Sequence, residues 1–210
     1  MSDPSQPASS GLPVDWAQHY ADGDTPWDHG AEHPELAARL GAGELAVPTP
    51  GARALVPGCG RGHDALALAR IGWAVTALDQ VPALEGLVNS GLQPLAGEYQ
   101  LGDALGWAPV SGEPDMELVF DHTFLCAIDV EQRPQFVDLV LRALRPGGQF
   151  VCLLFPVGKP REAGGPPHGL DVTQVEALFG DSLELLEHAP VAHSIEKREH
   201  GEHWSRFVRR

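Results

Sequence analysis

The sequence predicts an α/β fold organised around one nucleotide-binding β-α-β unit, and three observations carry the prediction. A glycine-rich turn separates two apolar runs, helix formers fill the space between the turn and the second run, and an acid, Asp79, follows that run. In chain order these segments are residues 54–56, Gly58, Gly60, Gly62, residues 64–70 and residues 74–78. Strand, glycine turn, helix and strand with a terminal acid form a unit that binds a nucleotide at the carboxyl ends of its strands.

The spacing of the glycines indicates the kind of ligand. A turn without Cβ atoms lets backbone N–H groups approach a ligand closely, and Asp79 stands where a carboxylate can accept both hydroxyls of a ribose. The pattern is Gly-x-Gly-x-Gly rather than the Gly-x-Gly-x-x-Gly of dinucleotide sites. A ligand with a ribose but no phosphates, such as S-adenosylmethionine (SAM), therefore fits better than NAD. The alternative is a turn that only connects two strands.

Composition narrows the class of protein. The 210 residues suit one α/β domain, and we expect a disordered tail over 1–13 and a single domain over 14–210. A net charge of −15 argues against a nucleic-acid binder. Neither three cysteines without paired spacing nor His193, His200 and His203 match a metal motif, so we expect no metal. With no apolar run of ~20 residues and no signal sequence, we expect a cytoplasmic protein without a membrane partner.

Two short helices are expected before the glycine turn, over residues 15–21 and 33–40, and a turn-rich loop separates them. The loop runs from Gly23 to Gly30 and contains Trp27. A large aromatic side chain in a polar loop needs cover. Trp27 either packs on the surface of the domain or closes over a ligand, and the two interpretations stay open.

The rest of the chain continues the alternation of helices and strands. The helix that contains Phe136 has the clearest 3.6-residue period, with Asp129 and Gln132 as a capping box and Pro146-Gly147-Gly148 as its stop. Pro156 is expected to end the strand after it. The expected helices are 81–89, the Phe136 helix and 171–179; the expected strands are 99–101, 116–120, 149–155, 183–187, 192–195 and 203–208.

Chemistry-bearing residues follow two of these strands. Asp103 either meets an adenine amino group or caps a helix. Asp121 and His122 stand at the end of the next strand, where ligands bind in an open parallel sheet. A Gly/Pro-rich loop over residues 159–169 is expected to cover the same side.

Several of these stretches together resemble the thiopurine S-methyltransferase family, and most of all its branch of thiol and halide (thiocyanate) methyltransferases. The resemblance covers nearly everything after the N-terminal tail. The stretches are Trp16-x-x-x-Tyr20, Gly23-Asp24-Thr25-Pro26-Trp27-Asp28, Leu55-Val56-Pro57-Gly58-Cys59-Gly60-Arg61-Gly62-His63-Asp64, Asp121-His122-Thr123-Phe124-Leu125-Cys126-Ala127-Ile128 and Gly164-Gly165-Pro166-Pro167.

The resemblance implies a Rossmann-like SAM-dependent methyltransferase fold, with a seven-stranded, mostly parallel sheet of order 3-2-1-4-5-7-6 and helices on both faces. It also implies a cofactor site, in which aromatic residues cover SAM, glycines approach its methionine part, Asp79 holds the ribose, Asp103 and Ala104 hold the adenine end, and Asp121 lies near the sulfonium. The implied cofactor residues are Trp16, Tyr20, Trp27, Gly58, Gly60, Asp79, Asp103, Ala104 and Asp121.

The implied reaction is methyl transfer to a small soft nucleophile, namely a thiol, sulfide, thiocyanate or halide, by a monomeric enzyme. Such an acceptor needs alignment and loss of water more than proton chemistry. His122, His168 or His29 can take a thiol proton, unless each is a packing or surface histidine. The implied acceptor pocket contains Trp27, Phe124, Phe155 and His168.

This chain departs from the family pattern in the aromatic cover and in the acceptor pocket. Tyr20 replaces a second Trp, and Phe155 and His168 replace Tyr residues of plant relatives. Two alternatives remain: a non-catalytic SAM-binding regulator and an NAD-linked oxidoreductase.

Overall fold

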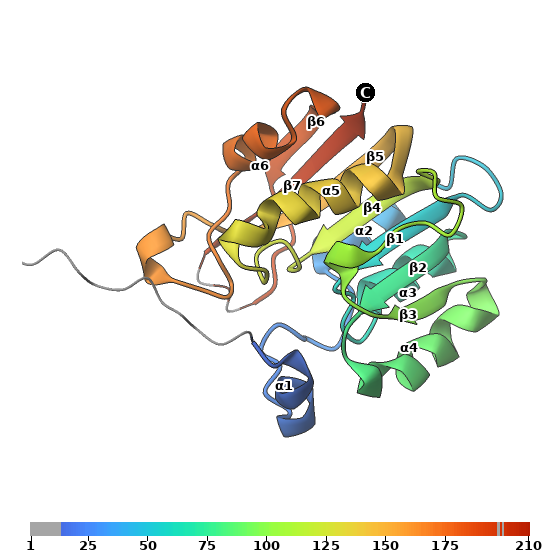
Figure 1. The fold of residues 1–210 in the computed structure, drawn as a ribbon, viewed down its shortest axis with the longest axis horizontal. Coiled ribbons are helices and arrows are strands. Elements are labelled where there is room, and N and C mark those ends of the chain that lie inside the picture. The colour runs from blue at the N-terminus through green and yellow to red at the C-terminus, as the bar shows by residue number, and fades with distance from the viewer. Residues whose placement is uncertain (1–13, 197, 199) are drawn as a thin grey trace, which may run out of the picture.

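The computed structural model describes residues 14–196, 198 and 200–210. Its centre is a seven-stranded sheet of order β3-β2-β1-β4-β5-β7-β6, which confirms the expected topology (Figure 1). The first five strands are parallel, and β7 is antiparallel to both of its neighbours. The strands are β1 (Arg53–Pro57), β2 (Ala74–Asp79), β3 (Glu98–Leu101), β4 (Met116–His122), β5 (Leu144–Val157), β6 (Leu183–Pro190) and β7 (Gly201–Arg209). The tail expected to be disordered lies outside the described residues.

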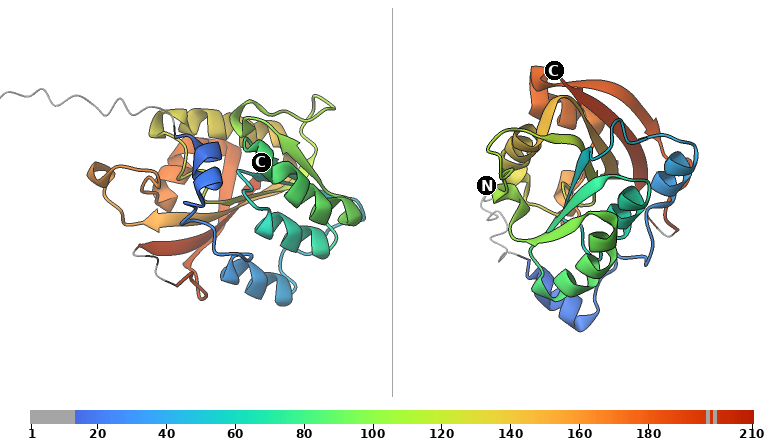
Figure 2. Two further views of the ribbon diagram at one scale, coloured as in Figure 1. Left: turned by 90° about the horizontal axis from the view of Figure 1, so that it is seen from below. Right: turned by 90° about the vertical axis from the view of Figure 1, so that its right-hand side faces the viewer.

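Helices cover both faces of the sheet, as expected (Figure 2). The α-helices are α1 (Trp16–Asp22), α2 (Pro34–Gly41), α3 (His63–Arg70), α4 (Glu85–Leu92), α5 (Arg133–Ala143) and α6 (Val172–Phe179). The apolar faces of α5 and α6 pack on one side of the sheet, and those of α2, α3 and α4 pack on the other. None of the helices in the described part of the chain is long and apolar enough to cross a membrane.

Alternation along the strands divides the core into these two layers. In β1, Leu55 faces the α5 side, whereas Ala54 and Val56 face the α3 side. All three side chains are buried because helices cover both faces, which is why the central strands read as continuous apolar runs. The helix α1 differs from the others: it buries none of its residues and lies apart from the sheet, on the side where the parallel strands end (Figure 1).

The helix α5 ends at Ala143, three residues before Pro146, as the expected stop signal places it, and Leu144 then pairs with Met116 of β4. Two expectations about local structure are wrong. Pro156 does not end β5, which continues to Val157; the proline lies at an irregularity in the pairing with β7, where its missing N–H costs no ladder bond.

The second concerns the strand expected over residues 192–195, where the described residues form no strand. The N–H groups of Ala192 and His193 donate to Glu35 instead, and that of Ile195 donates to Glu202. A smaller difference affects residues 81–89, where one turn of 3-10 helix (Pro82–Leu84) precedes α4. The capping box of Asp129 and Gln132 is confirmed; it caps a 3-10 turn, Val130–Gln132, that leads into α5.

Candidate active site

The glycine turn forms a cradle at the carboxyl ends of β1 and β2. Gly58, Gly60 and Gly62 all have positive φ, between 53° and 77°, which side chains disfavour. A Cβ on Gly58 would lie 2.5 Å from the Phe124 ring, and a Cβ on Gly60 would lie 2.7 Å from the Tyr20 hydroxyl oxygen. The absence of side chains is therefore what lets these neighbours close over the turn.

Asp79 joins the cradle to the end of β2. Its Oδ2 accepts the Gly60 N–H at 2.8 Å, and its Oδ1 accepts the Val81 N–H at 3.1 Å. Burial raises the pKa of Asp79 against the opposing effect of these hydrogen bonds. The carboxylate thus stands beside the glycine backbone, the place that a ribose-binding acid needs.

Tyr20 lies over Gly60 of this cradle, and the rings of Trp16 and Trp27 pack next to it; we call Trp16, Tyr20 and Trp27 the aromatic cover. The rings of Trp16 and Trp27 meet edge to face at 5.2 Å, and those of Tyr20 and Trp27 at 5.9 Å. Trp27 Nε1 donates to the Tyr20 hydroxyl at 3.2 Å. Burial raises the pKa of Tyr20 to about 12, so its hydroxyl stays neutral. The loop that carries Trp27 therefore lies over the glycine turn.

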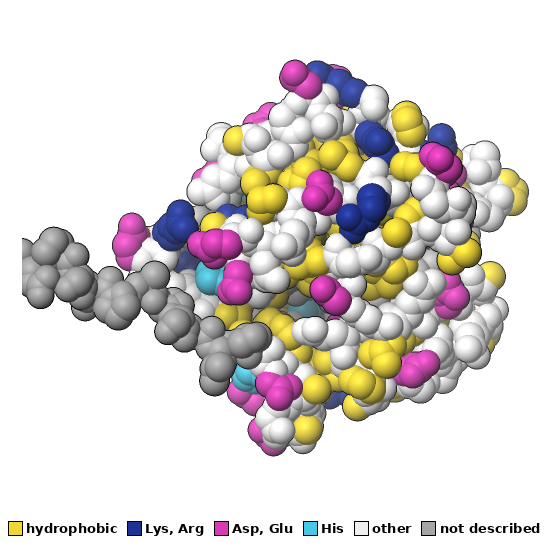
Figure 3. All heavy atoms as spheres, in the orientation of Figure 1, with side chains coloured by type: hydrophobic (Ala, Val, Ile, Leu, Met, Phe, Trp, Pro, Cys, Tyr) yellow, Lys and Arg dark blue, Asp and Glu magenta, His cyan; other side chains and the backbone are white. Residues whose placement is uncertain are grey.

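The expected acceptor residues lie in two places. Phe124 packs against Gly58. His168 is linked to the turn that carries Phe124, because its N–H donates to the Cys126 carbonyl at 2.7 Å. Phe155 instead lies under the guanidinium of Arg198, whose Cζ is 4.2 Å from the ring centroid. Figure 3 shows histidine side chains on the side of the molecule where α1 lies.

Two buried nitrogens at the loop over 159–169 have no hydrogen-bond partner among the described residues. They are His168 Nε2 and Arg133 Nε. Arg133 is 6% exposed, donates from Nη2 to the Gly169 carbonyl at 3.0 Å, and forms no ion pair in the part of the chain that the structure describes. Burial lowers the pKa of both side chains, so the imidazole is neutral near pH 7. Arg133, the first residue of α5, thus brings a cation without an ion pair among the described residues to the loop over 159–169, and the loop itself carries an imidazole nitrogen without a partner there.

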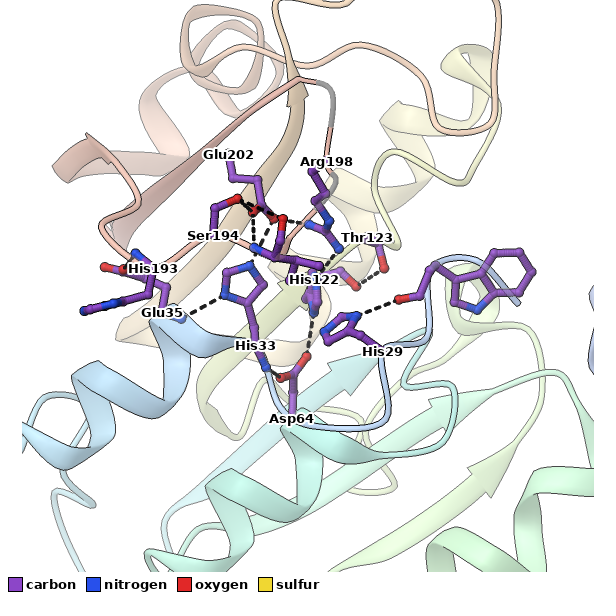
Figure 4. Close-up of polar contacts among 12 residues, drawn as sticks. His29, His33, Glu35, Asp64, His122, Thr123, His193, Ser194, Arg198 and Glu202 are labelled. Atoms are coloured by element: carbon purple, nitrogen blue, oxygen red, sulfur yellow. Dashed lines mark hydrogen bonds and ion pairs between the residues drawn. The ribbon is translucent and has the colours of Figure 1, made fainter. Parts of the chain in front are cut away.

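A buried polar network surrounds the other candidate base, His122 (Figure 4). His122 Nδ1 lies 2.7 Å from Asp64 Oδ2, and Nε2 lies 3.0 Å from Arg198 Nη2. Because Arg198 can only donate, Nε2 is the acceptor and Nδ1 carries the proton that Asp64 accepts. Both nitrogens of His122 are therefore engaged within the protein.

The same network brings together a metal-like set of side chains. Ligand atoms of His33, His122 and Glu202 lie within 4.8 Å of one another. Arg198 donates to both Glu202 and His122, and so supplies the positive charge at this place. His33 Nδ1 accepts the Glu35 N–H at 3.1 Å, which leaves its proton on Nε2, 3.0 Å from Glu202. These hydrogen bonds satisfy the cluster without an ion.

The acids expected near SAM have partners of their own. Asp121 is 1% exposed; its Oδ1 accepts the N–H groups of Phe124 and Leu125, and its Oδ2 lies 3.2 Å from the Cys152 sulfur. Burial raises the pKa of Asp121 to about 6. Its carboxylate thus shapes the turn that carries Phe124. Asp103 caps a short 3-10 helix through the Leu105 N–H, and Ala104 is buried there.

Sequence reasoning missed four charged residues of this region, and only two of them had a local signal. Asp28 directly follows Trp27, and Asp64 opens the helix after the glycine turn, so both stood inside motifs already singled out. Arg133 looked like an ordinary residue of an amphipathic helix. Arg198 lies between His193 and His203, in a stretch where the sequence shows no metal motif.

Comparisons with known proteins identify the family of the chain. The family model "Thiopurine S-methyltransferase (TPMT)" matches residues 13–207. The "Probable thiol methyltransferase 2" of Arabidopsis thaliana is 33% identical over 168 residues, which cover 78% of this chain and 70% of the relative. The "Thiopurine S-methyltransferase" of Xanthomonas campestris is 31% identical over 196 residues, which cover 84% of this chain and 86% of the relative.

A solved structure supports the fold independently. The Burkholderia thailandensis 1,6-didemethyltoxoflavin-N1-methyltransferase, with bound S-adenosylhomocysteine, superimposes with a TM-score of 0.73 at 19% identity, over 93% of this chain and 85% of that chain. The seven-stranded sheet and its order agree with this match. The chain is a SAM-dependent methyltransferase and belongs to the thiopurine S-methyltransferase family.

Proposed function

We propose that the protein transfers a methyl group from SAM to a small soft nucleophile: a thiol, sulfide, thiocyanate or halide. The observation that carries the proposal is the charge beside the loop over 159–169, where a buried Arg133 without an ion pair among the described residues donates to Gly169, the neighbour of a neutral His168. A buried cation that lacks a carboxylate favours an anionic partner.

The cofactor fits the cradle on the grounds already given. The aromatic cover faces the sulfonium, since aromatic faces attract cations, Gly58 and Gly60 approach the methionine part, and Asp79 accepts the ribose hydroxyls. Asp103 and Ala104 stay assigned to the adenine end. SAM supplies an electrophilic methyl group, and the protein's part is to align the acceptor with it and to exclude water.

Asp121 takes a different part from the one its position in the sequence suggests. It holds Phe124 in place through the backbone N–H groups of the turn, and Phe124 then forms a wall between Gly58 and the acceptor. Its influence on the sulfonium is indirect. Trp27, Phe155 and His168 complete the proposed pocket.

Of the two proposed bases, His168 is better suited to take a thiol proton than His122. Its Nε2 has no partner among the described residues, whereas both nitrogens of His122 are engaged. A halide or thiocyanate brings no proton, so His168 matters only when a neutral thiol enters. The names of the relatives in Arabidopsis thaliana, a thiol and a thiocyanate methyltransferase, are consistent with both kinds of acceptor.

Incubation with methyl-labelled SAM tests the proposal. The acceptor panel contains small thiols, sulfide, iodide and thiocyanate, with DNA, RNA and a protein mixture as macromolecular controls. Labelled methyl is expected on one or more of the small acceptors and not on the macromolecules. SAM binding without transfer to any small acceptor would indicate a regulator instead. We also expect, from the sequence, a monomer in the cytoplasm, and gel filtration tests the first of these.

A further inference from the structure

The aromatic cover is anchored less firmly than the helices on the sheet, because Trp16 and Tyr20 pack against the core on the α3 side but are only partly buried. Trp16 and Tyr20 stand on α1, which buries none of its residues, and Trp27 stands on a loop between α1 and α2. The contacts among the three rings hold them to one another. They do not by themselves fix the group over the glycine turn.

One carboxylate joins the loop to the turn. Asp28, the residue after Trp27, lies 2.6 Å from Nε of Arg61 and 3.1 Å from Nε2 of His63. Its Oδ1 also accepts the Gly30 N–H at 2.9 Å, which fixes the backbone of the loop. Arg61 lies within the glycine turn and His63 is the first residue of α3, so two contacts of this one side chain connect the loop to the cofactor cradle.

Burial and charge favour this connection. The Asp28 side chain is 13% exposed. Burial alone would raise its pKa, but the Gly30 N–H and the charges of His63 and Arg61 hold the pKa below its usual value, so the group is ionised. Hydrogen bonds from charged donors to a carboxylate are among the stronger ones in proteins.

Arg61 extends the connection to the cover itself. Its guanidinium carbon lies 5.5 Å from the centroid of the Tyr20 ring, within range of a cation–π contact. The Tyr20 hydroxyl in turn receives the Trp27 N–H and lies over Gly60. Asp28 therefore binds both the backbone of the loop and the cation beside Tyr20, and among the described residues it forms no hydrogen bond with a ring of the cover.

A second contact fixes the far end of the loop, where α2 begins. The His33 N–H donates to Asp64 Oδ1 at 2.8 Å, at the start of α2. Without Asp28, no ion pair of the described residues would connect the stretch from Thr25 to Glu32 to the cradle.

We propose that Asp28 is a positioning residue for cofactor binding: through Arg61 and His63 it holds the aromatic cover closed over the SAM cradle. The inference rests on the proposed placement of the cover over SAM. Asp28 acts through other residues and takes no part in the methyl transfer.

The test compares Asp28→Asn with a matched control, Asp24→Asn. Asp24 lies in the same loop, and its only ion pair among the described residues is an exposed one with His19 at 3.2 Å. Binding of SAM, which carries the sulfonium that the cover is proposed to face, is measured by calorimetry, and the melting temperature is measured by circular dichroism. Asp28→Asn is expected to raise the Kd about tenfold, which corresponds to ~1.4 kcal/mol, and Asp24→Asn to leave it unchanged.

Two further variants exclude a merely structural role. Asp28→Glu should recover part of the affinity. Arg61→Gln should weaken binding, and adding it to Asp28→Asn should weaken binding no further, because the two residues act as one unit. A lowered melting temperature with an unchanged Kd, or fully additive effects of Asp28→Asn and Arg61→Gln, would overturn the proposal.

The Trp27→Ala variant distinguishes a failure of the Asp28 proposal from a failure of the proposal that the aromatic cover lies over SAM. If Trp27→Ala weakens binding and Asp28→Asn does not, the assignment of Asp28 is wrong and the cover stands. If neither variant weakens binding, the cover does not contact the cofactor and both proposals fail. Methyl transfer to the small-acceptor panel by the wild-type protein remains a separate result.

Discussion

The carboxylate of Asp79 and the N–H of Gly60 are joined by a 2.8 Å hydrogen bond, across 19 positions of the chain. This bond connects the end of β2 to the turn after β1, so the proposed ribose acid and the proposed methionine cradle move as one piece. The proximity of the two groups follows directly from the parallel pairing of β1 and β2, in which Pro57 lies opposite Leu78.

Replacing Asp79 tests the cofactor site. Asp79→Ala is expected to weaken binding of S-adenosylhomocysteine by ~1.5–3 kcal/mol, the range for hydrogen bonds to a charged group. Calorimetry measures the loss, and circular dichroism checks that the domain still folds. Asp79→Asn keeps one acceptor oxygen and should lose less. Equal affinity of wild type and a folded Asp79→Ala variant contradicts the ribose assignment.

Removing Trp27 tests the cover. Trp27→Ala is expected to lower both SAM affinity and turnover, because it takes an aromatic face from the sulfonium and admits water. Steady-state kinetics at varied SAM gives both quantities. Trp27→Phe keeps a ring but loses the Nε1 donor to Tyr20. Its SAM affinity and turnover should therefore lie between those of wild type and Trp27→Ala. Wild-type parameters in Trp27→Ala mean that the loop only covers the surface.

His168 is tested by comparing acceptors with and without a proton. His168→Gln is expected to slow methylation of a neutral thiol while leaving iodide methylation nearly unchanged, since only the thiol must lose a proton. Because burial holds the pKa of His168 below its usual value, the loss should persist at pH 7, where the wild-type imidazole is neutral. An equal loss with both acceptors would assign His168 to the shape of the pocket instead.

Asp121 predicts a pH dependence of stability. Its pKa is raised from an ordinary value of 3.8 to about 6 in the folded protein, mainly by burial. The folded state therefore binds more protons between these values, and its stability falls as the pH rises through that window. Urea unfolding from pH 4 to pH 7 should show wild type losing stability relative to Asp121→Asn. Parallel pH profiles of the two proteins would disprove it.

Glu202 predicts the opposite sign. Burial opposes its ionisation, but hydrogen bonds from His33 and Ser194 and the charge of Arg198 lower its pKa to about 2. Its contribution to stability is present above about pH 4.5 and is lost as the pH falls toward 2. Glu202→Gln should cost ~3–5 kcal/mol at pH 7, because it leaves Arg198 as a buried unpaired charge.

A less buried acid on β6 serves as the control for this variant. Glu187 pairs with Arg39 and Arg206 at 29% exposure, and Glu187→Gln should cost about 1 kcal/mol or less. Urea unfolding at pH 7 measures both variants. A loss for Glu202→Gln no larger than that for Glu187→Gln would show that the network does not stabilise the fold.

The sheet order and the cradle followed from the sequence because their signals are local or belong to specific motifs. The period of Phe136, Leu139 and Val140 predicted α5, and the glycines with Asp79 predicted the cradle. The prediction of a strand over residues 192–195 was wrong for the opposite reason. Its N–H groups pair with Glu35, more than 150 positions away, and no local pattern carries that information.

The position of a residue along a strand also says less about its contacts than the face of the sheet to which its side chain points. Asp121 and His122 were both expected at the ligand edge, and both lie at the end of β4. Successive residues of a strand point to opposite faces, so Asp121 meets Cys152 on the α5 side while His122 meets Asp64 on the α3 side. The two side chains therefore cannot line one pocket, which a one-dimensional motif does not reveal.

The position of β7 between β5 and β6 has a consequence for biosynthesis. A polypeptide whose translation stops after β6 presents β5 as a long apolar edge, and it lacks Trp204 and Phe207, which fill the two layers of the core. Unpaired edges and exposed apolar surface are features of aggregation-prone, incompletely folded chains. Prematurely terminated products of this gene should therefore be removed by chaperones and proteases rather than persist as partly active enzyme.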